Sequence, residues 1–128
     1  MQPAPYYAPA PGMMVVSTPY VPGHRIVRTV GFTWGLIVRS RGVGGNFMAG
    51  LRTIFGGEIK EYTEMLDQAR HEALWRLIQH AQSLGANAIV SARFDSSEIG
   101  GTMTEILAYG TGVVVEGDTA QPQPVTLR

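Results

Sequence analysis

The sequence predicts an α+β domain in which a sheet buries one face under a long helix. Three observations lead to this prediction: one long segment with helical periodicity, several segments rich in β-branched and aromatic residues, and glycine-rich or polar connections between them. The chain has 128 residues, and six of its eight prolines precede Gly23. We therefore expect a proline-rich flexible arm over residues 1–23, one domain over 24–117 and a polar tail over 118–128.

The long helix is expected from Glu58 to Leu84, because neither proline nor glycine interrupts this stretch. Gly85 follows and can adopt the left-handed conformation that ends a helix. Two residues break the pattern: Trp75 falls on the polar side, and His80 falls in the apolar stripe, where we interpret it as a partly buried histidine bonded to the backbone. The stripe at helical spacing comprises Tyr62, Met65, Leu66, Ala69, Ala73, Leu77, Ala81 and Leu84.

Two strands are expected before the helix, Arg25–Val30 and Phe32–Arg39, hinged at Gly31. After the helix we expect a strand over Ala86–Phe94, a turn over Asp95–Gly101 and a long strand or strand pair over Thr102–Glu116. A short helix is predicted over Phe47–Phe55, and Met13–Val16 is apolar enough to add a short strand or to bind a neighbouring molecule. The core candidates in the first two strands are Ile26, Val30 and Phe32. Gly110 and Gly112 suggest a bulge or a close backbone approach.

Composition excludes several classes of function. The formal net charge is zero, so the chain lacks the basic surface expected of a nucleic-acid-binding protein. It contains no cysteine, which excludes disulfides, zinc–thiolate sites and cysteine nucleophiles. No apolar run has the length of a membrane span, and the first residues do not form a secretory signal. We expect a cytoplasmic protein with neither nucleic-acid binding nor membrane insertion.

Several motifs resemble the YbjQ-like family. In the long helix these are Tyr62, Leu66, Ala69-Arg70, Ala73, Leu77 and Ala81, and the run Leu84–Ile89 (LGANAI) follows them. The segment 48–52 (MAGLR), leading to Gly56-Gly57, resembles the stretch before the family's long helix. The segment 109–113 (YGTGV) resembles its last strand. The resemblance covers about residues 24–117.

The resemblance implies an antiparallel sheet packed against one long helix and a short helix, in a dodecin-like subunit. It also implies a homo-oligomeric ring, a pentamer or a multiple of one. The family carries the label "putative heavy-metal-binding domain", and its role is uncharacterised. The expected function is therefore that of a non-catalytic homo-oligomer of the YbjQ type.

A metal site is the first candidate for chemistry. Glu64, Asp67 and His71 lie on one strip of the long helix at positions i, i+3 and i+7, where two carboxylates and an imidazole could hold zinc, nickel or copper. The competing interpretation is a solvated helix face. No soft sulfur ligand from cysteine is present, so a divalent transition metal is the cofactor that fits these residues.

Aromatic residues are the second candidate. We expect Trp75, Trp34 and Tyr109 at a subunit interface, because an exposed tryptophan is unusual. Two alternatives remain open. In one, a ring of subunits encloses ligand clefts lined by these residues and Tyr62. In the other, an enzyme site forms across the interface, since the sequence contains neither a catalytic triad pattern nor HExxH.

Overall fold

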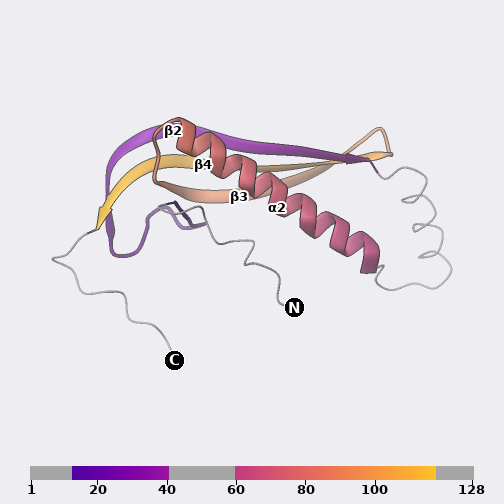
Figure 1. The fold of residues 1–128 in the computed structure, drawn as a ribbon, viewed down its shortest axis with the longest axis horizontal. Coiled ribbons are helices and arrows are strands. Elements are labelled where there is room, and N and C mark those ends of the chain that lie inside the picture. Colours follow the sequence, from indigo (N-terminus) through magenta and orange to yellow (C-terminus); the bar gives the residue numbers. More distant parts are fainter. Residues whose placement is uncertain (1–12, 41–59, 118–128) are drawn as a thin grey trace, which may run out of the picture.

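The structure, a computed structural model, describes residues 13–40 and 60–117. Its elements are β1 (Met14–Val15), β2 (His24–Ser40), α2 (Lys60–Ser83), β3 (Ala88–Ile99) and β4 (Met103–Gly117). The strands form one sheet in the order β1-β3-β4-β2, with α2 lying along it (Figure 1). The α+β class is confirmed, but the sheet is mixed rather than antiparallel, because β1 pairs with β3 in parallel. The predicted short helix Phe47–Phe55 lies outside the described residues.

The two strands expected before the helix form one continuous strand, β2. Its pairing with β4 shifts register between Thr29 and Gly31, and Gly31 has a positive φ of 142°, so the predicted hinge is a local irregularity inside a strand. The turn expected over 95–101 is shorter than predicted. β3 continues to Ile99, and only Gly100, Gly101 and Thr102 form the turn into β4, both glycines with positive φ.

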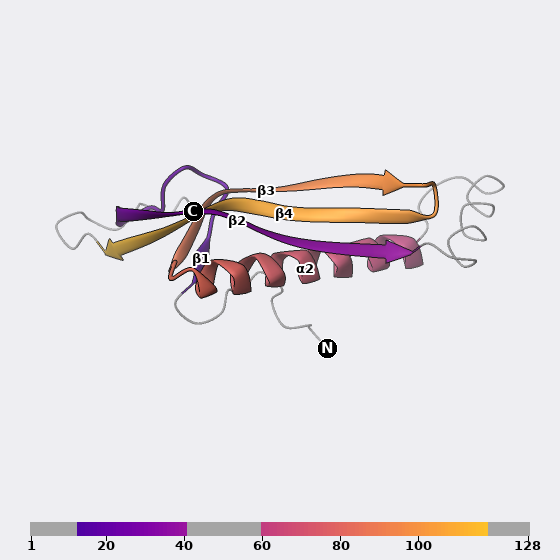
Figure 2. The ribbon, with the colours of Figure 1, turned by 90° about the horizontal axis from the view of Figure 1, so that it is seen from above.

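Helix α2 covers one face of the sheet and packs mainly on β2 (Figure 2). Its stripe of alanines and leucines supplies the contact, and Ala69, Ala73, Leu77 and Ala81 are fully buried. Gly35 of β2 lies directly beneath this stripe. A Cβ there would lie 2.3 Å from the carbonyl oxygen of Ala73 and 2.3 Å from the amide nitrogen of Leu77. The small residues on both elements therefore allow a close approach of helix and strand.

A second, smaller core lies on the other face, at the end of the sheet where β3 begins. Val21, which precedes β2, is buried there against the start of β3 and the end of β4. Met13 is also buried, although in the core under α2. The predicted strand at Met13–Val16 is confirmed as β1, so part of the range expected to be an arm belongs to the fold. The residues of this second core are Val21, Ala88, Val90, Val113 and Val115.

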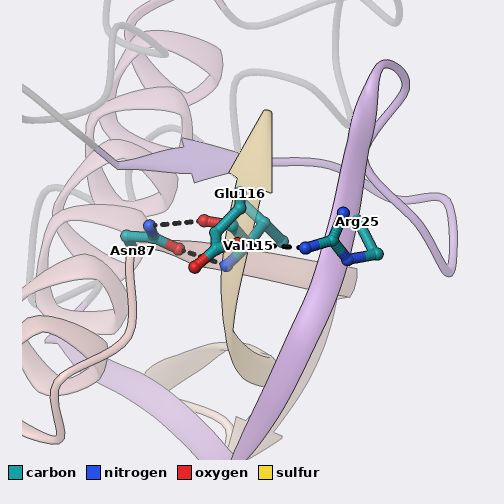
Figure 3. A network of polar contacts seen from close by, with 4 residues as sticks. All are labelled: Arg25, Asn87, Val115 and Glu116. Carbon is teal, nitrogen blue, oxygen red and sulfur yellow. Dashed lines mark hydrogen bonds and ion pairs between the residues drawn. The ribbon is translucent and has the colours of Figure 1, made fainter. Parts of the chain in front are cut away.

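The run LGANAI forms the end of α2 and the start of β3. Gly85 has a φ of 93°, its N–H donates to the carbonyl of Gln82, and the N–H of Ala86 donates to Ala81. This pair of bonds is the Schellman arrangement that satisfies the last carbonyls of a helix. The Asn87 side chain then bonds both backbone groups of Val115, donating at 3.0 Å and accepting at 2.8 Å (Figure 3). The motif therefore fixes the angle between the helix and the sheet.

Candidate functional site

The face of the sheet opposite α2 carries an uncovered apolar surface. Side chains alternate along β2, and Thr33, Gly35 and Ile37 are buried on the helix side. The residues between them point the other way, to the side of the sheet that Figure 2 shows without a helix. At the edge of the sheet the ring of Trp34 also meets the ring of His80 from α2, with ring centroids 4.4 Å apart. We call this surface the open face. On β2 it consists of Phe32, Trp34, Leu36 and Val38, which are 61%, 47%, 39% and 44% exposed.

The open face continues onto β4. Trp34 pairs with Tyr109 and Leu36 with Leu107 in the strand register. The ring of Phe32 lies 5.7 Å from that of Trp34 and 6.2 Å from that of Tyr109, so the three rings form one cluster. Taking roughly 150–250 Å² for a full aromatic side chain, Phe32 and Trp34 alone leave on the order of 200 Å² in water. With its aliphatic members, the open face reaches the size of surface patches that are often functional.

The open face shows that two residues predicted to be in the core are exposed. It also shows that two residues predicted at an interface are neighbours. Phe32 and Ile26 were expected in the core, but both are exposed, because the parity of β2 turns them away from α2. Trp34 and Tyr109, both expected at an interface, lie side by side on the open face. Trp75 is half exposed but lies apart from them, on α2.

The aromatic residues expected to line one cleft are therefore distributed over separate surfaces of the chain. Tyr62 lies near the start of α2 and lines a different hollow, together with Leu66 and Thr104. A single cleft containing all four aromatic residues is not formed within the described residues of one chain.

The outer edge of β2 is bonded by side chains of α2. The Trp34 backbone N–H donates to Nδ1 of His80 at 3.2 Å, and the Thr33 hydroxyl lies 2.9 Å from the same nitrogen. Because a backbone N–H donates to Nδ1, the proton of the neutral ring is placed on Nε2. One turn earlier, Arg76 donates to the Leu36 carbonyl at 3.1 Å. The interpretation of His80 as a partly buried histidine bonded to the backbone is confirmed.

The predicted metal residues are only partly brought together. His71 is largely but not fully buried, and its Nδ1 lies 3.8 Å from a carboxylate oxygen of Asp67, whereas Glu64 is exposed. Burial lowers the pKa of His71 from its ordinary value of 6.5, and the Asp67 carboxylate partly raises it again. Across residues 13–40 and 60–117, no three His, Asp or Glu side chains gather as a metal site. With no cysteine in the sequence, these donors include no thiolate, the ligand that soft heavy metals prefer.

The sequence reasoning missed the open face as a unit. It treated Phe32 as core and Trp34 as interface, and it assigned no role to Leu36 or Val38. The available signal was the apolar residue at every second position from 32 to 38. This alternation identifies one apolar face, but it does not state what covers that face.

Comparisons with known proteins agree with this fold. A family model described as "Putative heavy-metal-binding", that of YbjQ, matches residues 13–116. UPF0145 proteins of Methanocella arvoryzae and Methanoregula boonei are each 64% identical over 115 residues, which is 90% of this chain and 96% of each relative. A UPF0145 protein of a Bradyrhizobium species is 61% identical over 106 residues, covering 83% of this chain and 96% of that protein.

One solved structure shares the fold. It is a protein of unknown function from Pediococcus pentosaceus, assigned to the DUF74 family, with a TM-score of 0.58 and 16% identity. The match covers 82% of this chain and 99% of that one. At this identity the likeness concerns the fold alone. No helix in the described part of the present chain combines the length and apolar character needed to cross a membrane.

Proposed function

Because this chain belongs to the YbjQ family, whose function is uncharacterised, we propose its role from its own surfaces: it is a non-catalytic subunit of a homo-oligomeric ring. The observation that carries the proposal is the open face, where four consecutive outward positions of β2 are large apolar residues at least 39% exposed. Apolar surface of this kind gains free energy when a partner covers it, at roughly 25 cal/mol per Å² removed from water. A second copy is the partner proposed, since zero net charge limits repulsion between copies.

A ring needs two different surfaces on each subunit. A two-fold dimer uses one patch twice, whereas a cyclic assembly with an odd number of subunits joins two unlike patches head to tail. This chain offers an apolar surface on each layer: the open face on the sheet, and Trp75, half exposed, on α2. We propose that the open face of one subunit packs against the exposed side of α2 around Trp75 in the next subunit. The pentameric count is that of the family resemblance.

Native mass spectrometry with matched variants tests the assembly. We expect the wild-type mass to be five times that of the chain or a multiple of this. Leu36→Lys places a charge in the centre of the open face, and Trp75→Ala removes the anchor on the helix. Because both side chains are exposed in one subunit, each variant should fold, as circular dichroism would verify, yet lose assembly. Leu84→Ser, at an exposed leucine after α2, is the control and should keep the wild-type mass.

The outcomes separate three arrangements. A wild-type monomer at micromolar concentration would refute the proposal. A dimer that Leu36→Lys dissociates and Trp75→Ala leaves intact would mean that two open faces pack against each other instead. Retention of the oligomer in Leu36→Lys would remove the open face from the interface.

A metal is a second candidate, supported by the family label and the Asp67–His71 pair. Since the described residues of one chain lack a three-ligand site, any such site must draw ligands from a neighbouring copy or from the rest of the chain. Adding zinc, nickel or copper in the same measurement should give a whole number of ions per subunit, and His71→Gln should lose them. If the mass stays unchanged, or His71→Gln binds as wild type does, Glu64, Asp67 and His71 are not the ligands. The cytoplasmic location remains a prediction, which cell fractionation would test.

A further inference from the structure

A second hollow lies within the subunit, between α2 and β3. Because α2 packs mainly on β2 and least on β3, the helix side of β3 is covered incompletely. The floor of this space is formed by two small residues, Ala92 and Ala108, which cannot fill it. The result is a cavity of about 320 Å³ whose apolar walls include Val15, Leu74, Leu77 and Phe94. The cavity is partly open to solvent, and its size is that of a site for a small ligand.

A strained bulge shapes the cavity. The register of β3 against β4 shifts between Val90 and Arg93, and Ser91 has a φ of 54°, which is rare for a residue with a side chain. The N–H of Ser91 donates to the Thr18 carbonyl at 2.8 Å, so the segment after β1 holds the bulge in place. After the bulge, Phe94 pairs with Ala108 and faces the helix side. Bulges and strained residues of this kind concentrate at functional sites, where they redirect a side chain.

A guanidinium group lies beside the cavity, bonded to the backbone of Ser17, which is itself a lining residue. Arg93 is the one ionisable side chain among the described residues that line it. Its hydrogen bonds to the carbonyls of Ser17 at 3.3 Å and Ala92 at 3.4 Å both come from Nη1, so among the described residues its Nη2 and Nε donors are left for a ligand. The Arg70 guanidinium lies 5.5 Å from the ring centre of Phe94, one of the lining residues. An apolar space with guanidinium groups beside it is complementary to an amphipathic anion.

From this geometry we propose that the cavity binds a free medium-chain monocarboxylate, with its alkyl chain between α2 and β3 and its carboxylate on Arg93. The size follows from comparison with a cavity of roughly 150 Å³ that holds benzene, so twice that volume suits about a dozen non-hydrogen atoms, as in decanoate. The site lies within one subunit. It therefore does not depend on the proposed assembly.

Calorimetric titration of the full-length protein with decanoate, below its micelle-forming concentration, tests the proposal. We expect one site per subunit with a Kd of roughly tens of micromolar, which is within the usual range for a ligand of this size. Decylamine has the same chain with the opposite charge, and butyrate has the same charge with a short chain. Both should bind at least about tenfold more weakly, since each lacks one of the two features that the cavity recognises. Methyl NMR should show shifts at Ala92 and Ala108 on adding decanoate.

Two matched variants locate the charge. Arg93→Gln should weaken decanoate about tenfold without weakening decylamine, the effect expected of one charge-assisted pair at a partly exposed site. Arg28→Gln, at an exposed arginine of β2 away from the cavity, should leave decanoate binding unchanged. Any one of four results would overturn the inference: no saturable decanoate binding, equal affinity for decylamine, unmoved Ala92 and Ala108 methyl groups, or an Arg93→Gln affinity equal to wild type.

Discussion

Replacing Gly35 with alanine would place a methyl group inside the backbone of α2. The added Cβ would lie 2.3 Å from the Ala73 carbonyl oxygen, 2.3 Å from the Leu77 amide nitrogen and 2.8 Å from the Arg76 carbonyl carbon. Ordinary contact begins at about 3.4 Å, so helix and strand must separate by about 1 Å at this point. The obstructing atoms are helix backbone, which cannot move aside as a flexible side chain would.

The loss of stability follows from the packing contacts between α2 and β2 that this separation weakens. A 24-residue helix is about 36 Å long, and its fully buried alanines and leucine lie on both sides of the contact. A gap of about 1 Å forfeits a quarter to a half of each dispersion contact that it affects. Overpacking a core typically costs about 1–3 kcal/mol, and a clash with backbone should reach the upper end, about 3 kcal/mol or more. For a domain near 100 residues this lowers Tm by roughly 12–24 °C.

Thermal unfolding at fixed protein concentration measures this effect. Gly117→Ala is the matched control, because a Cβ there meets nothing within 4 Å, and we expect a change within about 0.5 kcal/mol. If Gly35→Ala and Gly117→Ala melt within about 3 °C of each other, the close approach of α2 to β2 is not as described. The reasoning about why α2 lies on β2 would then fail with it.

Three further substitutions test individual contacts. His80→Phe keeps a ring beside Trp34 but removes the acceptor of its backbone N–H, and should cost about 1 kcal/mol in urea unfolding. Asn87→Ala removes both hydrogen bonds to Val115 and should cost about 2 kcal/mol by the same measurement. Burial lowers the pKa of His71, so the unfolded chain binds a proton first as pH falls. The stability of wild type relative to His71→Gln should therefore decline as pH drops below about 6.5 and level off below the folded-state pKa.

Exposed neighbours provide the controls for these variants. Gln79→Ala, one position before His80, should change stability by less than about 0.5 kcal/mol. Glu116→Gln breaks only the exposed ion pair with Arg25 beside Val115 (Figure 3) and should be similarly small. A His80→Phe or Asn87→Ala variant as stable as its control would show that the hydrogen bond does not contribute. A His71→Gln variant whose pH profile parallels that of wild type would refute the expected effect of burial on His71.

Local signals in the sequence were sufficient to locate the long helix, its end and the strand at β1. The 3.6-residue period of the apolar residues located α2, and Gly85 located its end, because both depend only on neighbours along the chain. The same holds for the strand at β1 and for the close backbone approach at Gly110, where a Cβ would lie 3.0 Å from the carbonyl oxygen of Val90. The boundary of the turn before Gly100 was wrong. Polar residues there suited a loop, but pairing with β4 extends β3 through them.

The candidate metal site shows the limit of spacing along one helix. Glu64, Asp67 and His71 share a strip, but the packing of α2 buries His71 and leaves Glu64 in solvent. Burial of a helical residue depends on how the helix is rotated against the sheet. Spacing alone therefore identified residues that can meet, while the environment of each was set by the contact of α2 with β2.

By itself, the sequence determined that the chain is an α+β protein, where its long helix lies, and which family its motifs resemble. Only the tertiary structure decided which face of β2 is covered. Hydrophobicity alone would place the open-face residues of β2 (Phe32, Trp34, Leu36 and Val38) inside the protein. The helix instead covers the alternate residues of the strand, Thr33, Gly35 and Ile37. The physical reason is steric: the backbone of α2 can approach β2 only over Gly35, which has no side chain, and this leaves the larger apolar residues facing outward.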